Sequence, residues 1–208
     1  MIAIIDYKAG NLRSVERALM HLGVSCRVTD VPSEILLADR VIFPGVGAAG
    51  AAMNVIHSAR LDAVIHEVVD QGTPFLGICL GAQIILDKSD EGDTTCLGLI
   101  EGCAKIFPDM GMKIPHMGWN NISIKRSHPV LADIDERAQF YFVHSYYPQT
   151  ARSEDTIAEA DYGLAFSSVI GKDNIIAMQF HPEKSGRHGL AILKNFCTWN
   201  GKVEKNAE

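Results

Sequence analysis

The sequence has no long hydrophobic run, no excess of positive charge and no paired cysteine motif. The longest apolar stretch, around residues 74–86, contains Gly and Gln and is too short to cross a bilayer. The formal net charge of −6 argues against nucleic acid or an anionic membrane as the main partner. The five cysteines are odd in number and none forms a Cys-x-x-Cys pair, so we expect neither a disulfide framework nor a metal site.

These absences favour a cytosolic protein. Asp6 interrupts the opening apolar run at residues 2–5, so no secretory leader is predicted. With 208 residues and 47% hydrophobic content, the chain can bury one good core. Because no linker, repeat or low-complexity segment divides it, we expect one domain over residues 1–208.

The first half alternates between strand and helix patterns, which predicts parallel strands covered by helices. Asn11 is expected to cap a helix whose apolar face includes Val15 and Leu19. The second half contains strand patterns joined by short turns, at residues 121–125, 139–144, 156–160, 164–170 and 174–180. The predicted fold class is α/β and doubly wound: a mostly parallel central sheet with helices on both faces, and an antiparallel, strand-rich second half. Such sheets bind ligands at the carboxyl ends of their strands.

Cys79 lies at such an end, in the segment Gly77-Ile78-Cys79-Leu80-Gly81. A nucleophile on a sharp strand-to-helix turn takes a strained conformation, and flanking glycines avoid a collision there. A helix that starts at Leu80 brings free N–H groups toward the sulfur, which favours the thiolate, and directs one N–H toward an oxyanion. Taken alone, Cys79 is also compatible with a buried structural cysteine.

A second segment, residues 179–183, reads Gln-Phe-His-Pro-Glu. Pro182 disfavours a helical conformation at His181, so we expect an extended chain on which His181 and Glu183 point to the same side. Glu183 can then orient the imidazole, as the third member of a triad does. An isolated His-Pro-Glu is more often a loop, but the two segments together predict a Cys-His-Glu site.

A third segment, Phe43-Pro44-Gly45-Val46-Gly47, follows an apolar strand and should reach the same sheet edge. A Gly-rich turn at this position can aim backbone N–H groups into the site and supply a second oxyanion donor. Without Cys79, an ordinary strand-to-helix turn would explain these glycines.

These motifs resemble those of the class I, triad-type glutamine amidotransferases, and within that family those of the glutaminase subunits of imidazole glycerol phosphate synthase. The Cys and His motifs are shared by all triad amidotransferases, whereas the segments Tyr-x-x-Gly-Asn, His-Met-Gly-Trp-Asn and Phe-Val-His-Ser-Tyr are more particular to this subunit. The matching segments are Asp6-Tyr7-Lys8-Ala9-Gly10-Asn11-Leu12, Pro44-Gly45-Val46-Gly47, Gly77-Ile78-Cys79-Leu80-Gly81-Ala82-Gln83, Pro115-His116-Met117-Gly118-Trp119-Asn120, Tyr141-Phe142-Val143-His144-Ser145-Tyr146 and His181-Pro182-Glu183-Lys184-Ser185.

The resemblance implies a role for individual positions and no cofactor. Cys79 would attack the side-chain amide of L-glutamine, with His181 shuttling the proton and Glu183 orienting it. The oxyanion site would be formed by Gly45, Val46, Gly47 and Leu80. The glutamine pocket would be lined by Gln83, Glu91, His144, Ser145 and Tyr146. Taken singly, Glu91 also fits a solvated acidic run, and Tyr146 fits the core.

The resemblance also implies a partner, the TIM-barrel cyclase with which this subunit forms a heterodimer. Ammonia passes into the cyclase, which makes imidazole glycerol phosphate and aminoimidazole carboxamide ribotide in histidine biosynthesis. The positions that match the family's interface are Asn11, Trp119 and Lys184, although a buried core Trp would explain Trp119 as well. The sequence departs from the common pattern at Lys8 and Ala82, and Lys8 bears on the contact with the partner rather than on catalysis.

Two other hypotheses remain at this stage. The subunit of another amidotransferase, such as pyridoxal phosphate synthase or anthranilate synthase, would share the triad but should lack Trp119-Asn120 and His144-Ser145-Tyr146 in this context. A non-enzymatic binding module could keep the fold, but the intact set of Cys79, His181 and Glu183 argues against it.

Overall fold

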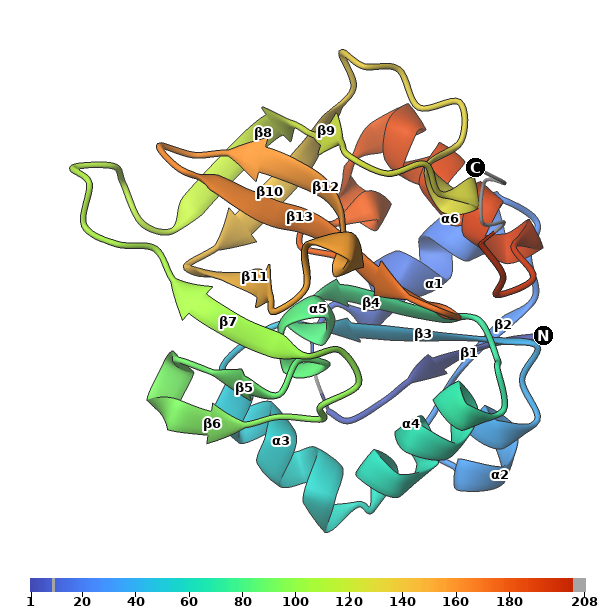
Figure 1. Ribbon diagram of the computed structural model, residues 1–208. Coiled ribbons are helices and arrows are strands. Elements are labelled where there is room, and N and C mark those ends of the chain that lie inside the picture. The colour runs from blue at the N-terminus through green and yellow to red at the C-terminus, as the bar shows by residue number, and fades with distance from the viewer. Residues whose placement is uncertain (9, 204–208) are drawn as a thin grey trace.

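A mixed sheet with the strand order β2-β1-β3-β4-β14-β13-β12-β9 forms the centre of the computed structural model, which describes residues 1–8 and 10–203 (Figure 1). Five neighbouring strands, β2, β1, β3, β4 and β14, run parallel to one another. Strands β13, β12 and β9 extend the sheet with antiparallel pairing. Their bounds are β1 (Ile2–Ile5), β2 (Cys26–Thr29), β3 (Arg40–Gly45), β4 (Phe75–Cys79), β9 (Ser123–Ile124), β12 (Thr156–Asp161), β13 (Ala165–Lys172) and β14 (Ile175–Met178).

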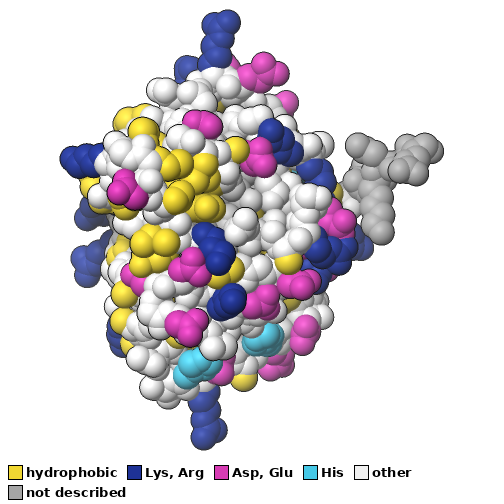
Figure 2. Space-filling model, turned by 60° about the vertical axis from the view of Figure 1, so that its left-hand side comes forward, with side chains coloured by type: hydrophobic (Ala, Val, Ile, Leu, Met, Phe, Trp, Pro, Cys, Tyr) yellow, Lys and Arg dark blue, Asp and Glu magenta, His cyan; other side chains and the backbone are white. Residues whose placement is uncertain are grey.

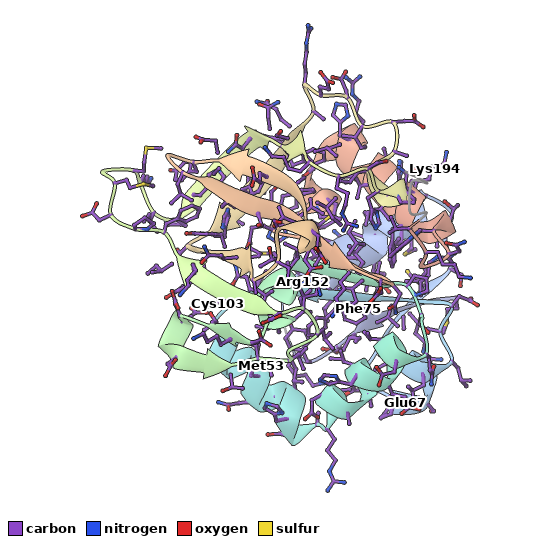
Figure 3. The ribbon with its side chains drawn as sticks, viewed as in Figure 1. Met53, Glu67, Phe75, Cys103, Arg152 and Lys194 are labelled. Carbon is purple, nitrogen blue, oxygen red and sulfur yellow. The ribbon has the colours of Figure 1, made fainter. Side chains whose placement is uncertain are left out.

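Helices cover both faces of this sheet, as predicted, and each face has its own apolar core. One face carries α1 (Leu12–His21) and α6 (Gly186–Thr198), and the other carries α2 (Pro32–Leu36), α3 (Ala49–Ser58) and α4 (Leu61–Asp70). Figure 3 shows how the side chains divide: Met53 and Phe75 lie in the packed layer, whereas Glu67 and Lys194 are exposed on the outer faces of their helices. The central strands β1, β3 and β4 are therefore buried from both sides, which explains why they contain no charged residue except Arg40 at the start of β3.

The second half adds two smaller sheets beside the central one. Strands β8 (His116–Asn121) and β10 (Gln139–His144) form an antiparallel ribbon. A second sheet has the order β11-β7-β5-β6, with β5 (Lys88–Ser89), β6 (Thr94–Thr95), β7 (Gly102–Ile106) and β11 (Tyr146–Thr150). The remaining elements are α5 (Leu80–Ile84) and short 3₁₀ turns at Glu91–Asp93, Pro129–Leu131, Ser153–Asp155 and Pro182–Lys184.

The position of β14 in the sheet matters most for function. This late strand pairs in parallel with β4, so that Met178 lies opposite Ile78, and β3 pairs with β4 from the other side, so that Gly45 lies opposite Cys79. The segments that follow three neighbouring parallel strands therefore meet at one edge of the sheet.

The predicted fold class is confirmed, with differences in detail. The strand expected at residues 121–125 is instead β8, which ends at Asn121, followed by the separate short strand β9. The helix α3 was not predicted, because its Ala-rich sequence carries only a weak apolar period. Asn11 occupies the N-terminal position of α1 but does not cap it: its backbone is left-handed (φ 74°) and its side chain makes no capping hydrogen bond.

The connection between β7 and β8 exposes several hydrophobic side chains on the surface. Figure 2 shows the side of the molecule that carries the β7–β8 connection, where hydrophobic side chains lie exposed in patches. In this connection Met110, Met112 and Ile114 are each more than a third exposed. Within the described part of the chain, no helix combines the length and apolar character that a membrane span requires.

Candidate active site

Cys79 sits at the sharp turn between β4 and α5, as the sequence predicts. Its backbone has φ 54° and ψ −108°, a conformation that a residue with a side chain rarely adopts. The helix begins at the next residue, Leu80. The turn therefore presents the sulfur of Cys79 at the end of a central strand, in the geometry of a nucleophile elbow.

The two flanking glycines are required by close backbone contacts. A Cβ atom on Gly81 would lie 2.0 Å from the carbonyl oxygen of Phe43 in the neighbouring strand. A Cβ atom on Gly77 would lie 2.9 Å from that of Ala177 and 3.1 Å from the carbonyl oxygen of Gly81. These contacts leave no room for a side chain at either position, so the two glycines allow the elbow to form.

His181 and Glu183 form a buried pair directly after β14. Nδ1 of His181 lies 2.8 Å from Oε1 of Glu183, and their side chains are 1% and 0% exposed. The local chain differs from the prediction: His181 is extended, but Glu183 lies in the 3₁₀ turn Pro182–Lys184 rather than on an extended segment. Ser185 holds this turn in place, because its hydroxyl donates to the carbonyl of His181 and accepts from the backbone N–H of Tyr141.

The surroundings of His181 favour its protonated form. Burial lowers the pKa of His181, but the nearby Cys79 sulfur and the Glu183 carboxylate outweigh this effect and raise it to about 9. Since Nδ1 faces Glu183, the other ring nitrogen is the one that can exchange a proton. That atom, Nε2, is buried and has no hydrogen-bond partner among the described residues.

Asn11 completes this arrangement. Its side-chain amide donates a 2.6 Å hydrogen bond to the same Oε1 atom of Glu183. The carboxylate oxygen that faces His181 is thereby held from two sides. The sequence assigned Asn11 to helix capping and to a partner interface, whereas the structure also places it against the carboxylate of Glu183.

The Gly-rich turn lines the same pocket as His181. β3 extends through Gly45, and Val46 and Gly47 line the cavity that contains Cys79. Gly47 has φ 102°, a backbone angle that favours glycine, and Val46 is more than a third exposed. Gly45 must also be small, because a Cβ atom there would lie 1.9 Å from the hydroxyl of Tyr7.

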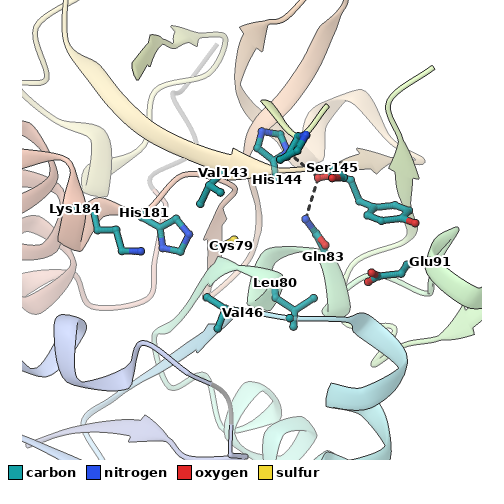
Figure 4. Close-up of a pocket in the computed structure, with 13 residues that line it drawn as sticks. Val46, Cys79, Leu80, Gln83, Glu91, Val143, His144, Ser145, His181 and Lys184 are labelled. Carbon is teal, nitrogen blue, oxygen red and sulfur yellow. Dashed lines mark hydrogen bonds between the residues drawn. The ribbon is translucent and has the colours of Figure 1, made fainter. Parts of the chain in front are cut away.

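A cavity of about 320 Å³ brings the predicted residues together (Figure 4). Its size falls within the range of small-molecule pockets. Its walls come from the elbow, the Gly-rich turn, the His181 segment and the strands β10 and β11. The predicted residues that line it are Val46, Gly47, Cys79, Leu80, Gln83, Glu91, His144, Ser145, Tyr146, His181 and Lys184.

The sequence analysis did not single out Gln179, whose side chain contacts both Cys79 and Gln83. Its side chain is fully buried and its Nε2 faces the Cys79 sulfur at 3.8 Å, while its Oε1 accepts a 3.0 Å hydrogen bond from Gln83. Gln83 also donates to the backbone carbonyl of Tyr146 at 2.9 Å. Both donors of the Gln83 amide are thus occupied by protein, so only its oxygen is available to a ligand. A glutamine two residues before a predicted catalytic histidine, on a buried strand end, was the available signal.

Glu91 is fixed at the far end of the pocket. One of its carboxylate oxygens accepts a 2.7 Å hydrogen bond from the backbone N–H of Ala49, at the start of α3. The acidic run around it is therefore not simply solvated surface: Glu91 closes a helix end and lines the cavity. Tyr146 lies nearby, and burial together with the negative charges of Glu91 and Asp90 raises its pKa.

Trp119 and Lys184 lie on the rim rather than in the core. Trp119 is 54% exposed, which excludes the core role that the sequence left open. Its ring meets that of Tyr141 edge to face, and the ammonium of Lys184 lies over the Tyr141 ring, 6.0 Å from its centroid. Tyr141 is thus a further rim residue that the sequence did not identify.

Known proteins share both the sequence and the fold. Residues 3–199 match the family described as glutamine amidotransferase class-I. The chain belongs to this family. Among similar amidotransferases, the imidazole glycerol phosphate synthase subunit HisH of Nitratidesulfovibrio vulgaris (strain Miyazaki F) is 50% identical over 206 residues, covering 96% of this chain and 97% of that protein. The subunit of the same name from Methanosarcina acetivorans is 50% identical over 198 residues, covering 94% and 96%.

Solved structures agree with the family at the level of the fold. PurLQS from Thermotoga maritima matches with a TM-score of 0.72 at 16% identity, over 94% of this amidotransferase and 96% of that chain. A crystal structure of a glutamine amidotransferase matches with a TM-score of 0.71 at 16% identity, over 95% and 100%. The predicted family, fold class and enzyme class are therefore confirmed. No set of three or more His, Cys, Asp or Glu side chains in the described ranges could hold a metal ion.

Proposed function

We propose that this amidotransferase is the glutaminase subunit of imidazole glycerol phosphate synthase and hydrolyses L-glutamine with Cys79, His181 and Glu183. One observation carries the chemistry: His181, whose Nε2 has no hydrogen-bond partner among the described residues and whose Nδ1 faces buried Glu183, lines the same pocket as the strained Cys79 elbow. The relatives that are about half identical over nearly their full length support the choice of synthase. We further infer that the whole chain folds as one amidotransferase domain and works in the cytosol.

The first half of the reaction forms a thioester. His181 takes the thiol proton of Cys79 on Nε2, and its raised pKa lets it keep that proton at neutral pH. The sulfur attacks the amide carbon of the glutamine side chain, a C–S bond forms, and the carbonyl electron pair moves onto oxygen. Backbone N–H groups of Leu80 and of the Gly45–Gly47 turn stabilise this oxyanion. The C–N bond then breaks as His181 protonates the nitrogen, which leaves as ammonia.

The second half restores the enzyme. His181, now neutral, takes a proton from water, and the oxygen attacks the thioester carbon. The C–S bond breaks, glutamate is released, and the sulfur again faces a protonated His181. Throughout both steps Glu183 accepts the hydrogen bond from Nδ1, so the same nitrogen exchanges protons each time.

Gln83, Glu91, His144, Ser145 and Tyr146 bind the substrate in this proposal. The carboxylate of Glu91 suits the α-ammonium group of an amino acid, and the oxygen of Gln83 accepts from a substrate N–H. The ammonia passes to a TIM-barrel cyclase that docks on the rim formed by Asn11, Trp119 and Lys184. An exposed Trp backed by an aromatic ring is the kind of residue that anchors interfaces.

The test is glutamate release from glutamine by the purified chain, alone and mixed with a histidine-pathway cyclase subunit and its nucleotide ligand. We expect release to depend strongly on the cyclase, because the Gly-rich turn can rotate a peptide N–H away from the site until the partner binds. We also expect Cys79→Ala to abolish release while cyclase binding persists.

Three other results would change the proposal. Activity of Cys79→Ala within about tenfold of wild type would exclude Cys79 as the nucleophile. Glutamine hydrolysis that ignores the cyclase would keep the triad and assign the chain to a different synthase. No hydrolysis under any of these conditions would exclude the glutaminase function.

A further inference from the structure

A line of hydrogen bonds connects strand β8 to the nucleophile. It starts at Asn120 and His116 on β8, crosses to His144 on β10 and reaches the backbone carbonyl of Tyr146. From there Gln83 and Gln179 continue it to Cys79. The successive donor–acceptor distances are 3.4, 3.0, 2.7, 2.9, 3.0 and 3.8 Å.

The donors and acceptors of the two histidines in this line follow from the chemistry of their partners. The carbonyl of Tyr146 can only accept, so Nδ1 of His144 must carry hydrogen. Burial lowers the pKa of His144 to about 3, so the ring is neutral and its Nε2 is an acceptor. Nδ1 of His116 must therefore donate to it.

The same reasoning fixes His116. Burial lowers its pKa to about 4, so this ring is also neutral and its Nε2 accepts from the amide of Asn120. Asn120 cannot flip freely, since its amide nitrogen also donates to the carbonyl of Asp161 and its oxygen accepts from the backbone N–H of Asn121. One tautomer of each histidine satisfies every partner.

Packing holds the His116 ring in the required plane. It is stacked between Phe142, at a centroid distance of 4.9 Å, and Tyr162, at 4.0 Å, with an interplanar angle of 24° in both cases. His116 and His144 are also directly opposed in the β8–β10 ribbon. Stacking thus fixes the plane of the ring, and the hydrogen bonds to His144 and Asn120 select the orientation in which Nδ1 meets His144.

We propose that His116 is a positioning residue for the glutamine site. It fixes His144 and the Tyr146 carbonyl, and through Gln83 and Gln179 it orders the surroundings of the Cys79 sulfur, although it does not itself line the pocket. Strand β8 turns Met117 and Trp119 outward, where they are 60% and 54% exposed, so one strand joins the rim to the nucleophile. This inference rests on the proposed glutaminase function.

The decisive variants are His116→Phe and His116→Asn. Phe keeps the stacked ring but removes the donor to His144, whereas Asn restores a donor close to the position of Nδ1. His128→Phe is the matched control. His128 is another buried neutral histidine, packed on Trp199 away from the pocket, so its replacement costs stability without touching the line.

Two measurements report on the variants. In the complex with the cyclase, we expect kcat/KM for glutamine to fall about tenfold or more in His116→Phe and to recover to within about threefold in His116→Asn. The second measurement uses the chain alone and follows the alkylation of Cys79 by iodoacetamide with peptide mass spectrometry. We expect alkylation to be several-fold slower in His116→Phe than in wild type. His128→Phe should match wild type in both assays.

Equal losses in His116→Phe and His116→Asn, or in His116→Phe and His128→Phe, would overturn the proposal, because stability alone would then explain them. An unchanged alkylation rate in His116→Phe would also overturn it. If the wild-type complex releases no glutamate, the proposed function fails, and the alkylation comparison still decides the role of His116.

Discussion

The side-chain amide of Asn11 donates a 2.6 Å hydrogen bond to Oε1 of Glu183, the oxygen that also lies 2.8 Å from Nδ1 of His181. A residue from the start of the chain thus orients a carboxylate that lies 172 positions later. A displacement of Asn11 would therefore change the position of the Glu183 carboxylate. Asn11 therefore links a predicted rim position to the predicted triad.

We predict that Asn11→Gly lowers kcat of the complex about tenfold, because Glu183 loses one of the two contacts that orient it. Glycine is chosen since Asn11 has a left-handed backbone that glycine tolerates. Asp173→Gly, at an exposed turn with φ 50°, is the control and should behave as wild type. Unchanged kcat together with weakened cyclase binding would show that Asn11 acts only at the interface.

Glu91→Gln should separate the two roles of this side chain. The amide oxygen can still accept from the Ala49 N–H, so the start of α3 stays closed and the melting temperature stays near that of wild type. The lost negative charge should raise KM for glutamine about tenfold or more. Steady-state kinetics and thermal unfolding together test this, and an unchanged KM would remove Glu91 from the substrate site.

Gly81→Ala should destabilise the fold by more than about 2 kcal/mol, because the new methyl group would meet the Phe43 carbonyl at 2.0 Å. Gly50→Ala in α3 is the matched control. Its Cβ would lie 3.3 Å from the hydroxyl of Thr94, and alanine favours the helix, so the change should stay within about 1 kcal/mol. Denaturant unfolding measures both, and equal effects would contradict the close-contact explanation.

The charge on His181 should make stability fall in alkaline solution. Its pKa is about 9 in the folded state and about 6.5 when unfolded, so its contribution is complete below pH 6.5 and lost as the pH rises through 9. We expect the free energy of unfolding to fall by roughly 1–3 kcal/mol over this window. Cys79→Ala should reduce the fall, since Cys79 is one cause of the raised pKa. If the free energy of unfolding of wild type and of Cys79→Ala fell equally with pH, Cys79 would not be a cause of the raised pKa of His181.

Buried His128 should have the opposite effect in acid. Burial, with a smaller effect from Arg126, lowers its pKa to about 4, so the unfolded state binds more protons between pH 6.5 and 4, and stability falls as the pH is lowered through this range. His128→Asn removes the titrating ring but keeps an acceptor for the Val130 N–H. Its acid slope should be shallower than that of wild type, and equal slopes would contradict this role of the buried ring.

The elements whose buried faces are apolar were predictable from sequence. The central strands are apolar on both faces, and the helix with Leu61, Val64, Ile65 and Val68 buries all four as its period predicts. The prediction missed the true bounds of strand β8 because the polar residues His116 and Asn120 face inward while Trp119 faces outward. This alternation is the reverse of the usual pattern, in which apolar residues face inward. Polar residues face inward there because they have hydrogen-bond partners, which a hydropathy pattern cannot reveal.

The sequence by itself determined which three residues we predict as nucleophile, histidine and carboxylate, because the elbow glycines and the proline after His181 restrict the local backbone. Only the tertiary structure decided how these parts meet. Parallel pairing of β14 with β4 brings together segments a hundred residues apart, and Asn11, Gln179 and His116 acquire their roles from partners far along the chain. Local backbone preference acts within a few residues, whereas these hydrogen bonds exist only once the sheet is assembled and water is excluded.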